Sequence, residues 1–202
     1  NLSSLNLKKN NKMACTALIH GRGLDCSRIS GGIKNIYFAV YDQIASFTYD
    51  STFAAEIDTI DFDSNTIYKY VMPLGVSSLT DTIVGSRENG TVYNTPSCSI
   101  ILNKLTKIDQ NEIKLLSQTK VIIFAELNQT LANGHNVIVA LGMENGMELN
   151  AGTMDSGAAW GDRNGYTLTF DGMEALPFPM VADYTTAPFD NAAFTMGTIV
   201  ES

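Results

Sequence analysis

Residues 120–127 (KVIIFAEL) and 136–141 (NVIVAL) are near-continuous apolar runs, and each has the length of a β-strand. Runs of this kind are typical of strands that are covered on both faces. Asn133-Gly134 lies between them and favours a turn, because this pair readily adopts positive φ. We therefore expect two central strands at the heart of a β-rich fold.

The sequence on both sides of this centre also favours strands. Residues 166–171 (YTLTFD) alternate apolar and polar side chains, as in a strand with one covered face. Glu88-Asn89-Gly90 predicts a hairpin turn between two long strands, and Pro96 in the second of these suits an edge or a bulge. The further expected strands cover residues 33–40, 44–49, 55–62, 66–72, 77–86 and 91–105.

One helix is predicted over residues 109–118. Asp109 is the expected N-cap, with Glu112 at the spacing of a capping box. A helix this short is not stable alone in water, so it must pack against the sheet. The chain is therefore expected to be mainly β: a β-sandwich or barrel of about eight to ten strands with one short flanking α-helix and an extended C-terminal arm.

The two ends of the chain differ from its centre. Residues 1–12 consist of Asn, Leu, Ser and Lys and precede the first methionine, Met13, which predicts an upstream or disordered segment. Residues 13–176 are expected to form the domain. Residues 177–202 carry large apolar groups with little alternation, so we expect an arm that buries itself on the parent domain or on a neighbour.

Composition restricts the class of function. Charged residues make up 17% of the chain, below the quarter or so usual for soluble domains, which favours a surface partly hidden against partners. The net charge of −8 argues against a nucleic-acid clamp, which would concentrate Lys and Arg. No apolar run is long enough for a membrane span. Cys15, Cys26 and Cys98 are expected to be free thiols in a reducing compartment.

Catalytic and metal-binding motifs are not evident. His20 and His135 stand in unrelated settings and do not form a zinc pair. A calcium loop starting at Asp61 fails, because its sixth residue is Thr66 rather than Gly and its twelfth is Met72 rather than Glu. We therefore expect no enzyme, no cofactor and no metal.

Two segments contain candidate contact residues: the glycine-rich loop 152–165 and the C-terminal arm. The loop holds the only tryptophan, and Trp and Arg are favoured at interface hot spots. The alternative role for Trp160 is to cap the core. The candidate inter-subunit contacts are Trp160, Asp162, Arg163, Phe178, Phe189 and Phe194.

Several blocks resemble a group of bacteriophage virion proteins. They are residues 13–16 (MACT) with Cys26 and Gly31-Gly32, 88–93 (ENGTVY), 99–105 (SIILNKL), 111–113 (NEI) and 161–174 (GDRNGYTLTFDGME). Together they cover most of the chain from Met13 to about Val181. Within virions the chain looks most like the tail-tube proteins of long-tailed phages.

This resemblance implies a β-sandwich or barrel with a flanking helix, stacked as hexameric rings around a channel for DNA. The sheets of six subunits would join into an inner barrel, and loops and arms would bridge successive rings. The implied partners are copies of the chain, other virion proteins and passing genomic DNA. The implied location is the virion tail, after assembly in the host cytoplasm, and no catalytic residues are implied.

The resemblance suggests roles for particular segments. The hairpin 77–105 is the candidate channel lining, with Asp81 and Glu88 as lumen-facing candidates, because an acidic lining repels phosphate. The loop 152–165 and the arm are candidate ring-to-ring contacts. The alternatives are a head decoration or head-to-tail joining protein, and a carbohydrate- or receptor-binding module that uses Tyr37, Tyr68, Tyr70 and Tyr93.

Overall fold

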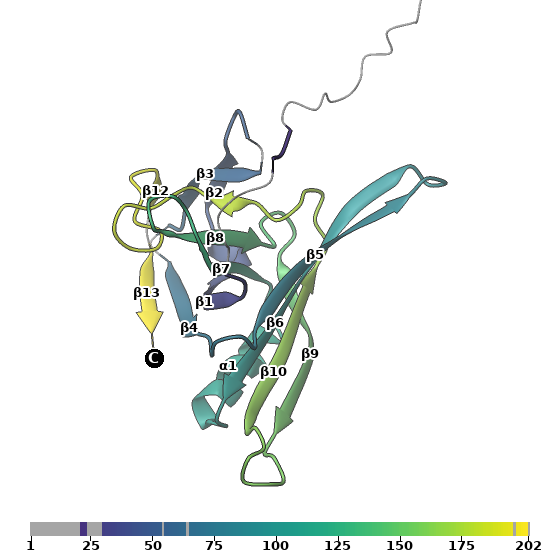
Figure 1. The fold of residues 1–202 in the computed structure, drawn as a ribbon, viewed down its shortest axis with the longest axis vertical. Coiled ribbons are helices and arrows are strands. Elements are labelled where there is room, and N and C mark those ends of the chain that lie inside the picture. Colours follow the sequence, from purple (N-terminus) through teal and green to yellow (C-terminus); the bar gives the residue numbers. More distant parts are fainter. Residues whose placement is uncertain (1–20, 24–29, 54, 64, 196, 202) are drawn as a thin grey trace, which may run out of the picture.

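The computed structural model describes residues 21–23, 30–53, 55–63, 65–195 and 197–201. Within these ranges the chain forms thirteen β-strands, one α-helix and one short 3-10 helix (Figure 1). The prediction of a mainly β fold with one helix is confirmed, with more strands than expected. The sheet is open, consistent with a sandwich and not closed into a barrel. The predictions for residues 1–12, Cys15, His20 and Cys26 lie outside the described residues.

The elements follow one another along the chain as follows: β1 (Ile33–Val40), η1 (Tyr41–Gln43), β2 (Ser46–Tyr49), β3 (Glu56–Asp61), β4 (Thr66–Val71), β5 (Ser78–Ser86), β6 (Thr91–Asn103), α1 (Lys107–Leu116), β7 (Val121–Thr130), β8 (Asn136–Leu141), β9 (Met147–Asp155), β10 (Gly165–Gly172), β11 (Met180–Val181), β12 (Phe194–Thr195) and β13 (Thr198–Glu201). The main sheet runs in the order β12-β3-β11-β8-β7-β9-β10-β6-β5, and β1 pairs with both β4 and β7.

Strand β7 lies at the centre of the fold, as its apolar sequence predicts. Ile123 and Ala125 point into one core, shared with α1, β6 and β10. Ile122 and Phe124 point into a second core, shared with β3 and the C-terminal segment. Because successive side chains of a strand point to opposite faces, a doubly covered strand needs apolar residues at every position.

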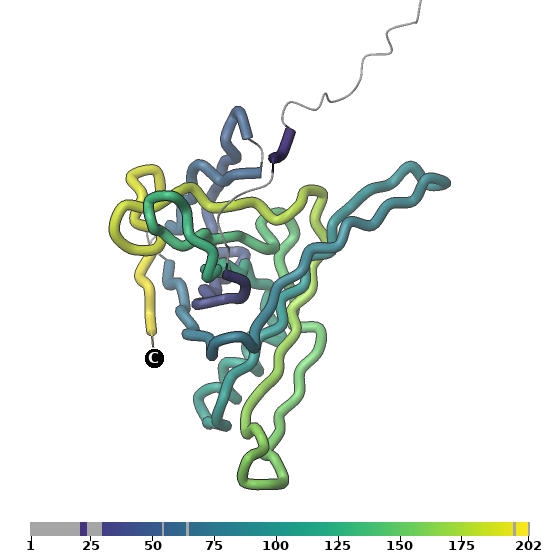
Figure 2. Tube along the Cα trace, in the orientation of Figure 1, coloured from purple at the N-terminus to yellow at the C-terminus, as the bar shows by residue number. Residues whose placement is uncertain are grey.

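Strands β9, β10, β6 and β5 form an antiparallel wing at one end of the main sheet. The β5–β6 hairpin projects beyond the body of the molecule, and the loop between β9 and β10 lies at the other end of the wing (Figure 2). The first core covers one face of the wing through Cys98, Ile100, Leu168 and Phe170. The residues between them, such as Ser99 and Thr169, face away from that core.

The predicted loop 152–165 is corrected in part, since residues 152–155 belong to strand β9. The loop proper covers 156–164. Strand β9 is polar on one face, contains Gly152 and is exposed over most of its length, so its sequence lacks the apolar alternation that identifies a half-buried strand.

The expected helix is present, but its N-cap is not Asp109. The helix begins at Lys107, and the Thr106 hydroxyl accepts a hydrogen bond from the backbone N–H of Asp109 at 3.0 Å. The same hydroxyl donates to Asp109 Oδ2 at 2.6 Å. Thr106 and Asp109 thus have the spacing of a capping box one turn earlier than the pair predicted from sequence.

The C-terminal segment lies on its own domain. Strands β11 and β12 pair in parallel with β3, and β13 pairs in parallel with β4. Phe189 is 0% exposed and Phe194 is 7% exposed, both in the second core. The arm was expected to bury its apolar groups either on the parent domain or on a neighbour. Phe189 and Phe194 are buried on the parent domain.

Candidate assembly interface

The uncovered face of the β9-β10-β6-β5 wing is built mainly from small polar side chains, with Ile101, Val84 and Tyr93 as larger apolar or aromatic members. The pairing register aligns them in rows across the four strands. One row contains Ser78, Ser99, Thr169 and Ala151, and the next contains Thr80, Ser97, Asp171 and Glu148. Serine and threonine side chains on an open sheet face remain hydrated, so they do not need to be covered by another layer of the protein.

This wing carries no positive side chain within its four strands. Strands β5, β6, β9 and β10 contain no Lys, Arg or His, whereas they contain Asp81, Glu148, Asp155 and Asp171. Four cations lie next to these strands. Lys120 Nζ lies 3.3 Å from Glu148 Oε1, and Arg163 Nη2 donates to Thr167 Oγ1 at 2.6 Å. Arg87 in the hairpin turn and Lys104 directly after β6 are exposed. The strands of the wing are therefore acidic and rich in hydroxyls, and the cations come from the segments around them.

The two outer strands of the wing are each nine residues long, and their outer edges are open except at Met147. Strand β5 pairs only with β6. Strand β9 pairs with β10 and meets β7 only where Met147 lies opposite Val121. Edge strands of this length present unpaired N–H and C=O groups and are ready to pair with another strand.

The two lumen candidates from sequence have different positions. Asp81 lies on the covered face, where its Oδ2 accepts a hydrogen bond from the backbone N–H of Phe178 at 3.1 Å. Glu88 is exposed in the turn at the tip of the β5–β6 hairpin. The carboxylates on the open face are instead Asp171, Glu148 and Asp155, of which the alternation in 166–171 could have identified Asp171.

The 156–164 loop displays Trp160 to solvent, so this residue does not cap the core. Its indole is 107% exposed relative to the reference state. Asp162 fixes the loop, because its Oδ2 accepts hydrogen bonds from the N–H groups of Ala158 at 2.9 Å and Ala159 at 2.7 Å. These two bonds also lower the pKa of Asp162. Trp160 is therefore held on a structured turn.

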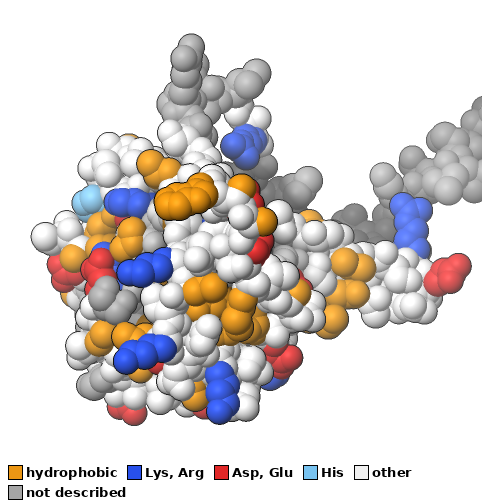
Figure 3. Space-filling view, turned by 90° about the horizontal axis from the view of Figure 1, so that it is seen from below, with side chains coloured by type: hydrophobic (Ala, Val, Ile, Leu, Met, Phe, Trp, Pro, Cys, Tyr) orange, Lys and Arg blue, Asp and Glu red, His pale blue; other side chains and the backbone are white. Residues whose placement is uncertain are grey.

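The other contact candidates are divided between the surface and the core. Asp162 and Arg163 are exposed beside Trp160. Phe178 is half-buried against the first core, while Phe189 and Phe194 are internal. Seen from the end of the molecule that carries the 156–164 loop, apolar side chains gather among Lys and Arg side chains, and the hairpin points to one side (Figure 3).

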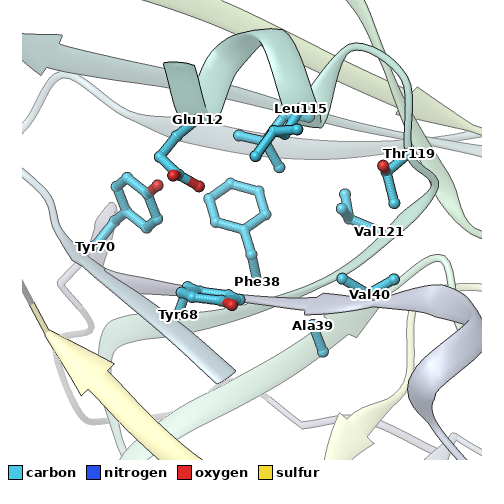
Figure 4. Close-up of a pocket in the computed structure, with 10 residues that line it drawn as sticks. Phe38, Ala39, Val40, Tyr68, Tyr70, Glu112, Leu115, Thr119 and Val121 are labelled. Atoms are coloured by element: carbon cyan, nitrogen blue, oxygen red, sulfur yellow. The ribbon is translucent and has the colours of Figure 1, made fainter. Parts of the chain in front are cut away.

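An apolar groove of about 210 Å³ lies between α1, β1 and β4. Phe38 points toward Leu115 of the helix, and Glu112 lies beside Tyr70 (Figure 4). Tyr68 also lines this groove, but Tyr37 belongs to the second core and Tyr93 to the projecting hairpin. The four tyrosines of the carbohydrate-binding alternative are therefore not gathered on one face.

Two kinds of feature are absent from the part of the chain that the structure describes. No helix there is long and apolar enough to cross a membrane. No group of three or more His, Cys, Asp or Glu side chains there is arranged to hold a metal ion.

Comparison with known proteins found no match to a protein-family model, to a curated protein or to a solved structure. The resemblance to tail-tube proteins therefore rests on the sequence blocks quoted above.

Proposed function

We propose that this protein is a structural subunit that joins copies of itself edge to edge into closed rings around a channel, as the resemblance to phage tail-tube proteins implies. The observation that supports this proposal is the antiparallel wing with open edges on two outer strands of equal length and an uncovered, mostly polar face. A wing of this kind can be extended by a second copy at each side.

The number of strands in the wing makes such joining regular. Neighbouring strands are antiparallel throughout, so the two edge strands of a four-stranded wing run in opposite directions. When copies are related by rotation about one axis, β5 of one copy meets β9 of the next in antiparallel orientation. The resulting sheet is antiparallel without interruption, and such a head-to-tail contact closes into a ring when the rotation allows it.

The lengths of the edges suggest one register. Full overlap places Ser78 opposite Asp155 of the neighbour and Thr82 opposite Ala151. These pairs match open face with open face up to the bulge near Asn150, whereas a one-residue slip would turn Met154 to the polar side.

This register is compatible with the geometry of a closed barrel. Within one copy, the row of paired residues that starts at Ala151 on β9 ends at Ser78 on β5. In the proposed junction, Ser78 lies opposite Asp155 of the neighbour. Crossing one copy therefore shifts the register along β9 from residue 151 to residue 155, a stagger of about four residues for four strands. The ratio of stagger to strand number is that of an eight-stranded barrel with a shear of eight, whose strands tilt by about 36°. A ring of six copies, the number implied by the resemblance, would contain about 24 strands, more than the 16–18 that leave an aqueous channel in porins.

The face that would line the channel suits the passage of DNA. It offers hydroxyls and carboxylates, and within the four strands it lacks the Lys and Arg side chains that bind phosphate. The body of the molecule, with both cores and α1, would lie outside the channel. The partners in this proposal are copies of the chain, other virion proteins of the tail, and DNA that passes without specific binding.

Charge pairs across the proposed junction test it. Thr80 and Thr153 lie opposite each other in the full-overlap register, so Thr80→Lys with Thr153→Lys should prevent assembly, and Thr80→Lys with Thr153→Glu should restore it. The measurement is negative-stain microscopy of purified protein together with sedimentation velocity. Thr95→Lys on the inner strand β6 is the matched control.

Hollow tubes that respond to these pairs as expected support the proposal. Closed rings that never stack would favour the head-to-tail joining alternative. A wild-type protein that remains monomeric at millimolar concentration, or an assembly indifferent to the charge pairs, overturns it.

A further inference from the structure

A second surface lies beside the open edge of β5. The end of β4 and its connector to β5 expose three aliphatic side chains, with Val71 58%, Leu74 81% and Val76 44% exposed. Exposed apolar groups this close together on a short segment are typical of a contact surface. Their position next to Ser78, where β5 begins, connects them to the proposed junction.

We infer that Trp160 of one copy packs onto Val71, Leu74 and Val76 of the next copy in the ring. This inference rests on the proposed function, because it follows from the register of the β5–β9 junction. It names the partner of both surfaces as a second copy of this chain.

The register brings the two surfaces together. In an antiparallel pair, residues before Ser78 in one copy continue alongside residues after Asp155 in the other. Trp160 follows Asp155 by about five residues, and Leu74 precedes Ser78 by about four, so the two lie at nearly the same distance from the last strand pair. Both belong to turns rather than strands, which keeps each apex close to the junction.

The chemistry of the two surfaces is complementary. Trp160 presents a large flat apolar group from a loop that Asp162 holds in place, so little conformational freedom is lost when it binds. The connector and the end of β4 offer branched aliphatic side chains, which pack well against an indole. Met154, 57% exposed on the covered side of β9, would lie next to the same contact.

The contact is heterologous, since each copy supplies one indole and one aliphatic cluster. A ring therefore buries every Trp160 on a neighbouring connector, and only an open end leaves one exposed. The edge hydrogen bonds fix the direction of the strands, and the tryptophan adds apolar contact area at the end of the junction.

Cross-linking and fluorescence test this contact. In a Cys15→Ser, Cys26→Ser background, chains with Pro73→Cys are assembled with chains carrying Ala159→Cys and then oxidised, and a disulfide between copies is expected. Both changes leave Trp160 and its three aliphatic contacts in place. A parallel mixture of Thr80→Cys and Thr153→Cys chains reports on the strand junction itself.

Because Trp160 is the only tryptophan, its emission reports on this site alone. A blue shift is expected on assembly of the wild type, and Leu74→Asp should abolish the shift and raise the protein concentration needed for assembly by on the order of tenfold or more. Leu131→Asp, at an exposed leucine in the β7–β8 turn, should change neither.

The two proposals can fail separately. If the Thr80–Thr153 disulfide forms while the Pro73–Ala159 disulfide and the blue shift are absent, the tryptophan contact is wrong and the ring proposal stands. If neither disulfide forms and no assembly is seen, both are wrong.

Discussion

At the scale of single residues, Glu126 shows how a buried charge is held. It is 2% exposed in the apolar strand β7, and it accepts hydrogen bonds from Asn35 at 2.7 Å, Tyr37 at 3.0 Å and Lys34 at 3.0 Å. Burial opposes its ionisation, but these bonds outweigh burial and lower the pKa of Glu126. The sequence offered no sign of this network, because its donors lie about 90 residues away on β1.

Replacing Glu126 should therefore destabilise the fold. Glu126→Ala leaves Asn35 and Tyr37 as buried donors with no acceptor, each at a cost of about 1–3 kcal/mol, so the free energy of unfolding should fall by at least about 2 kcal/mol. Glu126→Gln keeps one acceptor and should cost less. Urea unfolding followed by circular dichroism measures both changes.

The same residue should influence stability in acid. Its folded-state pKa lies below the ordinary 4.5, so its contribution is complete above that value and is lost as the pH falls through the folded pKa. Burial raises the pKa of Glu174, so ionisation of this group lowers the stability of the fold. That loss of stability develops as the pH rises above 4.5, outside the range in which Glu126 acts. Below pH 4.5, Glu126→Gln should thus lose less stability than the wild type, and equal slopes would contradict this assignment.

At the scale of elements, the sequence predicted the strands whose burial is reflected in their own pattern of apolar side chains. Strands β1, β7, β8 and β10 have one or two covered faces, and their apolar patterns placed them correctly. Strand β9 was missed because its outer edge and one face are open. Strands β11, β12 and β13 are two to four residues long and depend on pairing with distant β3 and β4, which no local pattern indicates.

The cap of α1 gives a prediction at this scale. Thr106→Ala removes the hydroxyl that accepts from Asp109 N–H, so the free energy of unfolding should fall by about 1 kcal/mol. Thr106→Ser keeps the hydroxyl and serves as the matched control. If thermal and urea unfolding show the alanine and serine variants to be equally stable, the cap contributes nothing.

At the scale of the whole molecule, the candidate site could be predicted only in outline. The hairpin 77–105, Trp160 as a contact candidate and the acidic balance were visible in the sequence, while the exposure of Trp160 was left open. The sequence alone could not show which face of β5 carries Asp81. The covered face is the one that packs against Cys98, Phe178 and the first core, and these contacts are visible only in the fold. The open edges of β5 and β9 likewise became visible only with the sheet order.

If the proposed ring forms, reversing the charge of the open face should make its channel retain DNA. Asp171→Lys with Glu148→Lys replaces two carboxylates with ammonium groups in each copy, so assembled tubes should bind DNA with an affinity that falls steeply as salt rises. Asp42→Lys with Asp58→Lys makes the same change in net charge at exposed sites outside the wing. Equal retention of DNA by both variants in a filter-binding assay would show that the open face does not line the channel.

In the proposed assembly, the two open edges of the wing also have a kinetic consequence. A linear string of copies has one junction fewer than it has members, and its two ends are free to dissociate. The last joining event adds a junction within a single particle, without a further loss of translational freedom, so the closed particle is far longer-lived than any string. Incomplete particles should therefore be scarce, and assembly should start abruptly at a threshold concentration.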